Sequence, residues 1–285
     1  MTGRFRDKTC VLCRVRPSVG VGEHVVPEWY IRDFADEAPF RSENADVTYQ
    51  NRRGKDAVHQ ALPVPHVPMC TECNGHLNTF IEASAKPVIR KLVPRSLDHE
   101  WPTITAEEAA AVGKWLLKVC LLWGHPEADD DNPHVMRGPD IGRFKFIEPE
   151  WLAWMRDGID PPDGFTVYAS RRHPLSEGVP WTGDVRRIGL PSSGMAREKE
   201  QRFMKREVGL LGLDATIVWH PGWPIENPLV AEGRAVVLWP NPTAIDFAAL
   251  GEVRSGEISI VISDDSHAGT QGGPDTSPGQ RHVDT

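Results

Sequence analysis

Apolar residues recur at helical spacing in the middle of the chain. They begin directly after Thr105-Ala-Glu-Glu108, which has the composition of a capping box, and stand three or four positions apart. These apolar positions are Val112, Leu116, Val119 and Trp123. The pattern predicts a helix over residues 106–123, in which Cys120 is expected to be a small core residue.

A second helical pattern begins at Asn74. Its apolar positions are Leu77, Ile81, Ala85 and Ile89. Pro87 is expected to kink or end this helix, because proline lacks the backbone N–H that the helix needs. Asn74, Asn78 and Glu82 share one face at four-residue spacing. Such a polar stripe is usually the solvated side of a helix, although Glu82 is also a candidate site residue.

Residues after 148 change from helical to strand patterns. Pro149 is expected to open a short helix, and the loop before it covers residues 125–148. Four later runs are rich in β-branched or aromatic residues, namely residues 165–169, 215–219, 234–239 and 258–262. The sequence therefore predicts an α+β fold whose second part has a mainly antiparallel sheet. Residues 263–285 have few apolar side chains and are expected to be a disordered tail.

The distribution of charge divides the chain near residue 97. The net charge of the whole chain is -8, but residues 1–97 carry 14 Lys and Arg against 11 Asp and Glu. We therefore expect an N-terminal domain over residues 1–97 and an accessory domain over residues 98–262. A contact with nucleic acid, if there is one, belongs to the N-terminal domain.

Several classes of protein are poor matches to this sequence. It has no run of about 18 apolar residues, so no membrane-spanning helix and no membrane partner are expected. The basic start lacks an apolar segment, so no secretory signal is expected, and a cytoplasmic location is predicted. The chain also has no P-loop, dinucleotide fingerprint or nucleophile-elbow motif, which argues against nucleotide-dependent and serine-hydrolase chemistry.

Four of the five cysteines form two C-x2-C pairs. Cys10 and Cys13 make the first pair, Cys70 and Cys73 make the second, and 56 residues separate the pairs. Two such pairs supply the four thiolates of a tetrahedral zinc site with no open position, so the zinc would be structural. The alternative is a set of unpaired buried thiols.

The order of motifs around these cysteines resembles the HNH endonuclease superfamily in its zinc-ribbon, treble-clef (ββα-metal) form. That family has C-x2-C, then Asp or Glu with His followed by hydrophobic residues and Pro, then C-x2-C with His or Asn at once. Here the middle motif is Glu23-His24-Val-Val-Pro27, and Asn74 follows Cys73 directly. The resemblance covers about residues 8–92 and is closest to a bacterial or phage subgroup of HNH-like proteins.

The resemblance implies a role for each matching residue. His24 would be the general base that activates water against a DNA phosphodiester. Glu23 and Asn74 would hold a catalytic divalent ion such as Mg²⁺, with His76 as a further candidate ligand. Taken alone, Glu23-His24 is also compatible with an ordinary surface histidine, and Asn74 is compatible with a helix N-cap.

Two family positions are not matched directly. The middle Asn that holds the base histidine in place has Asn51 as its best candidate, with His59 or His66 as replacements. The Lys three residues beyond the C-N position is Leu77 here. Both departures bear on turnover more than on fold.

The partner expected from the resemblance is DNA. Arg52, Arg53 and Lys55 would contact its phosphates, as would the basic residues Arg90, Lys91 and Arg95, or these side chains form a solvated surface. A protein partner or an oligomer is possible through residues 98–262. Two other functions stay open. One is a non-catalytic zinc-ribbon module that binds nucleic acid or protein, and the other is a metal-dependent hydrolase of small phosphoesters.

Overall fold

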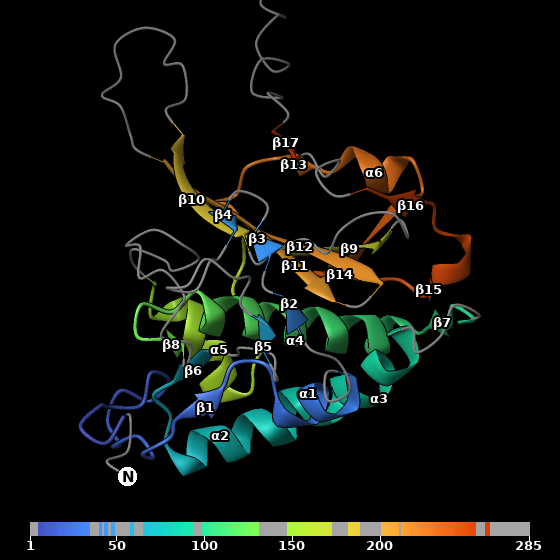
Figure 1. Cartoon of the computed structure of the whole chain (residues 1–285). Helices are drawn as coiled ribbons and strands as arrows, with labels where there is room; N and C mark the ends of the chain where they lie inside the picture. The colour runs from blue at the N-terminus through green and yellow to red at the C-terminus, as the bar shows by residue number, and fades with distance from the viewer. Residues whose placement is uncertain are drawn as a thin grey trace, which may run out of the picture.

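The computed structural model of the protein shows a mixed α+β fold (Figure 1). It describes residues 5–34, 40–41, 43–44, 47–48, 58–59, 65–93, 99–130, 147–172, 182–188, 201–210, 212–254 and 260–262. Its α-helices are α1 (Glu28–Phe34), α2 (Thr71–Leu77), α3 (Ala83–Leu92), α4 (Ala106–Trp123), α5 (Glu150–Asp157) and α6 (Pro228–Ala231). A π-helical turn, η1 (Asn78–Glu82), joins α2 to α3, and a 3₁₀ turn, η2 (Phe247–Ala249), lies near the end.

The largest sheet belongs to the second half of the chain. Its antiparallel strands follow the order β10 (Thr182–Ile188), β11 (Gln201–Leu210), β12 (Leu213–Trp219), β9 (Phe165–Arg172) and β14 (Ala235–Trp239). The short strand β16 (Glu252–Val253) pairs with β9 in parallel, so the sheet is mixed but mainly antiparallel. This confirms the α+β class expected from the sequence.

The remaining strands are short. A three-stranded sheet has the order β1 (Glu23–His24), β6 (Pro65–Val67) and β8 (Asp129–Asp130). The two-residue strands pair as β2 (Phe40–Arg41) with β5 (Val58–His59), β3 (Glu43–Asn44) with β4 (Val47–Thr48), β15 (Ile245–Asp246) with β7 (Thr103–Ile104), and β13 (Ile225–Glu226) with β17 (Val261–Ile262).

Helix α4 lies between the large sheet and the N-terminal elements. It packs on β9, β12 and β14 on one side, and on α3, η1 and β6 on the other (Figure 1). The predicted capping box is present, because the Thr105 hydroxyl accepts from the Glu108 N–H and the Glu108 carboxylate accepts from the Thr105 N–H. Gly113 allows close contact with β14, since a Cβ there would lie 2.6 Å from the Leu238 carbonyl oxygen.

Helix α2, which contains Cys73 and Asn74, starts earlier than the sequence pattern predicts. It begins at Thr71 rather than at Asn74, because the Cys70 sulfur caps it by accepting from the Cys73 N–H. Asn74 is therefore inside the first turns and is not an N-cap. Pro87 does not end the helix, which continues to Leu92.

One continuous core includes side chains from both parts of the chain. It contains residues of the cysteine pairs, of α2 and α3, of α4 and of the large sheet. Cys120 is fully buried in it, as predicted. The domain boundaries at 97 and 262 remain predictions.

Most of the predicted strands and helices are confirmed. Strands β9, β12 and β14 cover the first three predicted runs, and α5 begins one residue after Pro149. Within the fourth run only residues 260–262 are described, and they include β17. The predicted disordered tail, residues 263–285, lies outside the described residues. Among the described helices, none is long and apolar enough to cross a membrane.

Candidate metal centre and candidate active site

The four paired cysteines come together although the two pairs are far apart in sequence. The first pair lies on a tight N-terminal loop, where the Cys10 N–H donates to Arg16 O and the Arg14 N–H donates to Cys10 O. This loop is held against the second pair by the Val11 N–H, which donates to Pro68 O. The ligand atoms of all four thiols lie within 4.8 Å of one another.

The geometry of this cluster fits a zinc ion. The sulfurs of Cys13 and Cys70 are 4.0 Å apart, and all cysteines among the described residues are free thiols. Zinc–sulfur bonds of about 2.3 Å in a tetrahedron place sulfurs about 3.8 Å apart. A disulfide would need about 2.05 Å. The cluster is therefore consistent with the predicted structural Zn²⁺ site.

The thiols of the cluster differ in acidity when no ion is present. Burial raises the pKa of Cys10 and of Cys73 above the ordinary value. Burial also acts to raise the pKa of Cys13, but the backbone N–H groups of Arg16 and Val15 and the neighbouring thiols lower it to about 6. A bound cation favours the thiolate at every position, so metal binding would release protons.

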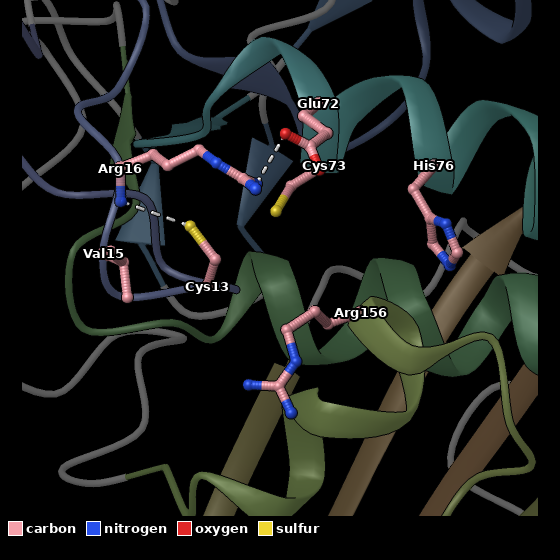
Figure 2. Close-up of a pocket in the computed structure, with 7 residues that line it drawn as sticks. All are labelled: Cys13, Val15, Arg16, Glu72, Cys73, His76 and Arg156. Atoms are coloured by element: carbon pink, nitrogen blue, oxygen red, sulfur yellow. Dashed lines mark hydrogen bonds and ion pairs between the residues drawn. The ribbon is translucent and has the colours of Figure 1, made fainter.

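A pocket of about 320 Å³ lies beside the cluster (Figure 2). It is lined by two of the cysteines, by Val15 and Glu72, and by Arg16, His76 and Arg156. His76 stacks on Phe80, with ring centroids 4.1 Å apart. The structure thus places His76 on the pocket next to Cys73. Its predicted role as a ligand of the catalytic ion stays a prediction.

Glu23 and Asn74 are in contact at the candidate active site, which is separate from the cysteine cluster. Glu23 is in β1, Asn74 is in α2, and the Asn74 side chain hydrogen-bonds the Glu23 carboxylate. The Asn74 Oδ1 atom accepts from Asn78 Nδ2 at 3.2 Å. Burial raises the pKa of Glu23 to about 7; Lys118 and Asn74 act to lower it, and Glu82 and Glu28 act to raise it. The structure therefore joins two of the residues predicted to hold a divalent ion.

His24 lies beside a second histidine. It faces His66 across the antiparallel β1–β6 pair, and the two ring centroids are 4.0 Å apart. Opposed residues of an antiparallel pair project to the same face of the sheet. His66 is thus the residue that contacts the predicted base, whereas the first candidate for this position, Asn51, lies outside the described residues. His59 pairs with Phe40 in the separate β2–β5 pair.

Two charged residues lie near Glu23. The sequence leaves Glu82 open as a candidate site residue or as part of a solvated stripe, and it does not single out Lys118. Glu82 does not lie on a solvated stripe, because only 3% of it is exposed and it forms an ion pair with the fully buried Lys118. The sequence signal for Lys118 is its position: it is the only charged residue between Trp115 and Trp123. Long charged side chains are almost never fully buried unless they are paired.

The DNA contacts expected for these basic residues stay predictions. Arg52, Arg53 and Lys55 lie outside the described residues, as does Arg95. Arg90 forms an ion pair with Asp33, and Lys91 forms one with Glu108. These two cations thus have partners within the protein.

Comparisons with protein-family models, with curated proteins and with solved structures found no match to this chain. The contacts of the site itself are therefore the basis for a functional proposal.

Replacing Glu23 by Gln is expected to stabilise the protein in a pH-dependent way. The folded-state pKa of Glu23, about 7, lies above its ordinary value of 4.5, so its contribution to stability is lost as the pH rises through 7. Without added Mg²⁺, the stability of Glu23→Gln relative to the wild type should increase by about 2 kcal/mol between about pH 5.5 and 8.5. Urea unfolding at several pH values measures this difference. Glu100→Gln, at an exposed position, is the control, because Glu100 is not among the charges that act on Glu23. A difference for Glu23→Gln that does not change with pH would contradict the prediction.

Proposed function

We propose that the protein is a metal-dependent endonuclease of the HNH type that hydrolyses DNA phosphodiester bonds. The observation that supports this most is the contact between Glu23 and Asn74, one residue from His24. It joins the two motifs on which the resemblance depends, although they are 50 residues apart. The order of elements agrees with a ββα arrangement, since β1 pairs with β6 and β6 leads through the second cysteine pair into α2.

The donor set of Glu23 and Asn74 fits a hard divalent ion. One carboxylate and one amide oxygen are ligands that Mg²⁺ accepts, and the remaining positions would be left to water and substrate phosphate. When bound, such an ion would supply Lewis acidity at the scissile phosphate. The protein's own contribution is to bring the Glu23 carboxylate and the Asn74 amide into contact. The Asn74 Oδ1 atom accepts from Asn78 Nδ2, so it would turn to an ion in exchange for that hydrogen bond.

His24 would move the proton of the reaction. An imidazole nitrogen of His24 would accept a proton from the attacking water as the new bond to phosphorus forms. The bond to the 3′ oxygen then breaks, and that oxygen leaves as a hydroxyl once it has gained a proton. His66, whose tilted ring lies 4.0 Å from that of His24 between centroids, would hold the His24 ring in position. The four-cysteine zinc would have a structural role only, since a closed thiolate shell has no position for substrate.

The test is cleavage of DNA by the purified, zinc-loaded protein. Supercoiled plasmid and single-stranded DNA are incubated without added divalent ion, with Mg²⁺ and with Mn²⁺. We expect cleavage only when Mg²⁺ or Mn²⁺ is added, and none from Glu23→Gln. Zinc-loaded protein that leaves both substrates intact under all conditions would overturn the proposal. A mobility shift without cleavage would then indicate a binding module.

A further inference from the structure

Lys118 is a buried cation in the C-terminal half of α4, and its side chain is 0% exposed. Its ammonium group is 2.8 Å from Glu82 Oε1 and donates to the Val25 carbonyl oxygen at 3.2 Å. The second carboxylate oxygen of Glu82 accepts from Trp29 Nε1 at 3.1 Å. We name Lys118, Glu82, Trp29 and the Val25 carbonyl the Lys118 cluster.

The cluster joins three separate segments at the candidate active site. Val25 directly follows His24, and its N–H donates to the carbonyl oxygen of Pro65, the first residue of β6. Glu82 is on the same continuous helix as Asn74, at the end of the π-turn η1. Lys118 comes from α4, which also supports the large sheet. The ammonium group thus connects Val25, the residue after the strand that carries Glu23 and His24, to Glu82 on the helix that carries Asn74.

The geometry of Glu82 depends on the π-turn. A π-turn inserts one extra residue into a helix and rotates the residues that follow it, and such turns are frequent at functional sites. In this protein the turn ends at Glu82, whose side chain is buried, whereas Asn78 at its start is exposed. The polar stripe expected for a regular helix is therefore broken, and Glu82 faces Lys118.

Stability alone is a weak reason for this arrangement. A buried ion pair often contributes no more than apolar side chains of similar volume would, because both charges lose their hydration. The three directed hydrogen bonds of the Lys118 cluster fix a specific geometry, which apolar side chains would not do. Lys118 is the main opposing charge at Glu23, and Glu82 and Glu28 are like charges there. Lys86 also lies over the Trp29 ring, with its Nζ atom 5.5 Å from the ring centroid.

From these contacts we propose that Lys118 is a positioning residue for the Glu23–His24–Asn74 site and acts through Glu82 and the Val25 carbonyl. This inference rests on the proposed function for the role of the site, but its structural part can be measured without catalysis. It also gives the second half of the chain a function, since α4 supplies the group that holds β1 and the α2–η1–α3 helix together.

The test uses a double substitution that leaves the net charge of the Lys118–Glu82 pair at zero. Lys118→Met with Glu82→Gln removes both charges, and Gln keeps an oxygen that can accept from Trp29. The affinity for Mn²⁺ is measured on zinc-loaded protein by titration calorimetry, with Glu23→Gln defining the specific signal. Hydrogen exchange of residues 23–26 is followed by mass spectrometry. We expect Mn²⁺ affinity to fall about 10-fold, in the range known for groups that orient metal ligands. Exchange at residues 23–26 should also become faster.

The matched control is a second buried ion pair on the other side of α4. Arg172 in β9 pairs with Asp214 in β12, within the large sheet. Arg172→Met with Asp214→Asn is expected to leave Mn²⁺ affinity and exchange at residues 23–26 unchanged. Zinc content and melting temperature are measured for both double variants. If Lys118→Met/Glu82→Gln loses its zinc, Trp29→Phe is the second variant, and it removes the indole N–H donor to Glu82 together with one ring. We expect its Mn²⁺ affinity to fall by no more than about 10-fold, and unchanged affinity would overturn the positioning role.

The outcomes separate this inference from the proposed function. The positioning role would be overturned if the folded Lys118→Met/Glu82→Gln variant bound Mn²⁺ as tightly as the wild type and its exchange at residues 23–26 were unchanged. If the wild type itself binds no Mn²⁺ through Glu23, the proposed function fails. In that case the exchange rates alone decide whether Lys118 holds the strand.

Discussion

Cys73→Ser is expected to abolish zinc retention and to lower the melting temperature by more than about 10 °C. Cys73 lies in the first turn of α2 and is buried, and its sulfur is one of four that lie within 4.8 Å of each other. A serine hydroxyl at this position is a far weaker zinc ligand than a thiolate. Structural zinc binds with apparent free energies of about 10–16 kcal/mol in small zinc domains, so losing the ion removes a large share of folding stability.

The effect should spread beyond the cysteines because they belong to the main core. Among the described residues, the N-terminal loop is also joined to the β6–α2 segment by backbone hydrogen bonds such as Val11 N–H to Pro68 O, by the contacts of Ser18 with Met69, and by the exposed Arg16–Glu72 ion pair. Without the ion, the buried thiols Cys10 and Cys73 have a raised pKa and take up protons. The zinc would therefore act as the link between two chain segments 56 residues apart.

Zinc per chain, measured by atomic emission, and thermal unfolding by circular dichroism check this expectation. Cys120→Ser is the matched control, because Cys120 is fully buried in α4 but lies outside the four-cysteine group. It should keep one zinc per chain and lose only the stability expected for a polar change in the core. Full zinc content in purified Cys73→Ser would contradict the assignment of Cys73 as a ligand.

His24→Ala is expected to reduce DNA cleavage by about 10²- to 10⁴-fold, the range in which general bases contribute. His24 is only partly buried, so its removal should leave the fold nearly unchanged. The zinc cluster is formed by other residues, so zinc content should also stay the same. A loss of activity without loss of zinc would separate the catalytic site from the structural one.

The measurement is the initial rate of plasmid cleavage in Mn²⁺, with zinc content determined for each protein. His99→Ala is a suitable control, since His99 packs on Trp101 at the start of the segment before β7. It should cleave at the wild-type rate. Residual activity of His24→Ala above about one tenth of the wild type would show that another group, such as His66, accepts the proton.

Local patterns predicted α4 and the cysteine cluster correctly because each depends on short-range rules. The capping box at Thr105 and Glu108 is made by neighbours in sequence, and the helix after it follows an apolar period of 3.6 residues. The first C-x2-C pair lies on a tight loop and the second lies at the start of α2, and a shared ion is the expected way to satisfy both. The start of α2 was placed three residues too late because the cap is the sulfur of Cys70, a role that cysteine does not signal in sequence.

The sequence by itself thus determined the α+β class, the long central helix and the grouping of the four cysteines. Through the family resemblance it also predicted that Glu23, His24 and Asn74 belong to one active site. Only the tertiary structure decided that Asn74 contacts Glu23, that His66 lies against His24 and that Lys118 pairs with Glu82. These contacts join residues 36 to 93 positions apart, such as Lys118 with Glu82 and with Val25. Pairings of this kind depend on how α4 packs between two layers and on where a π-turn directs one carboxylate. Neither is encoded in a local period of apolar and polar residues.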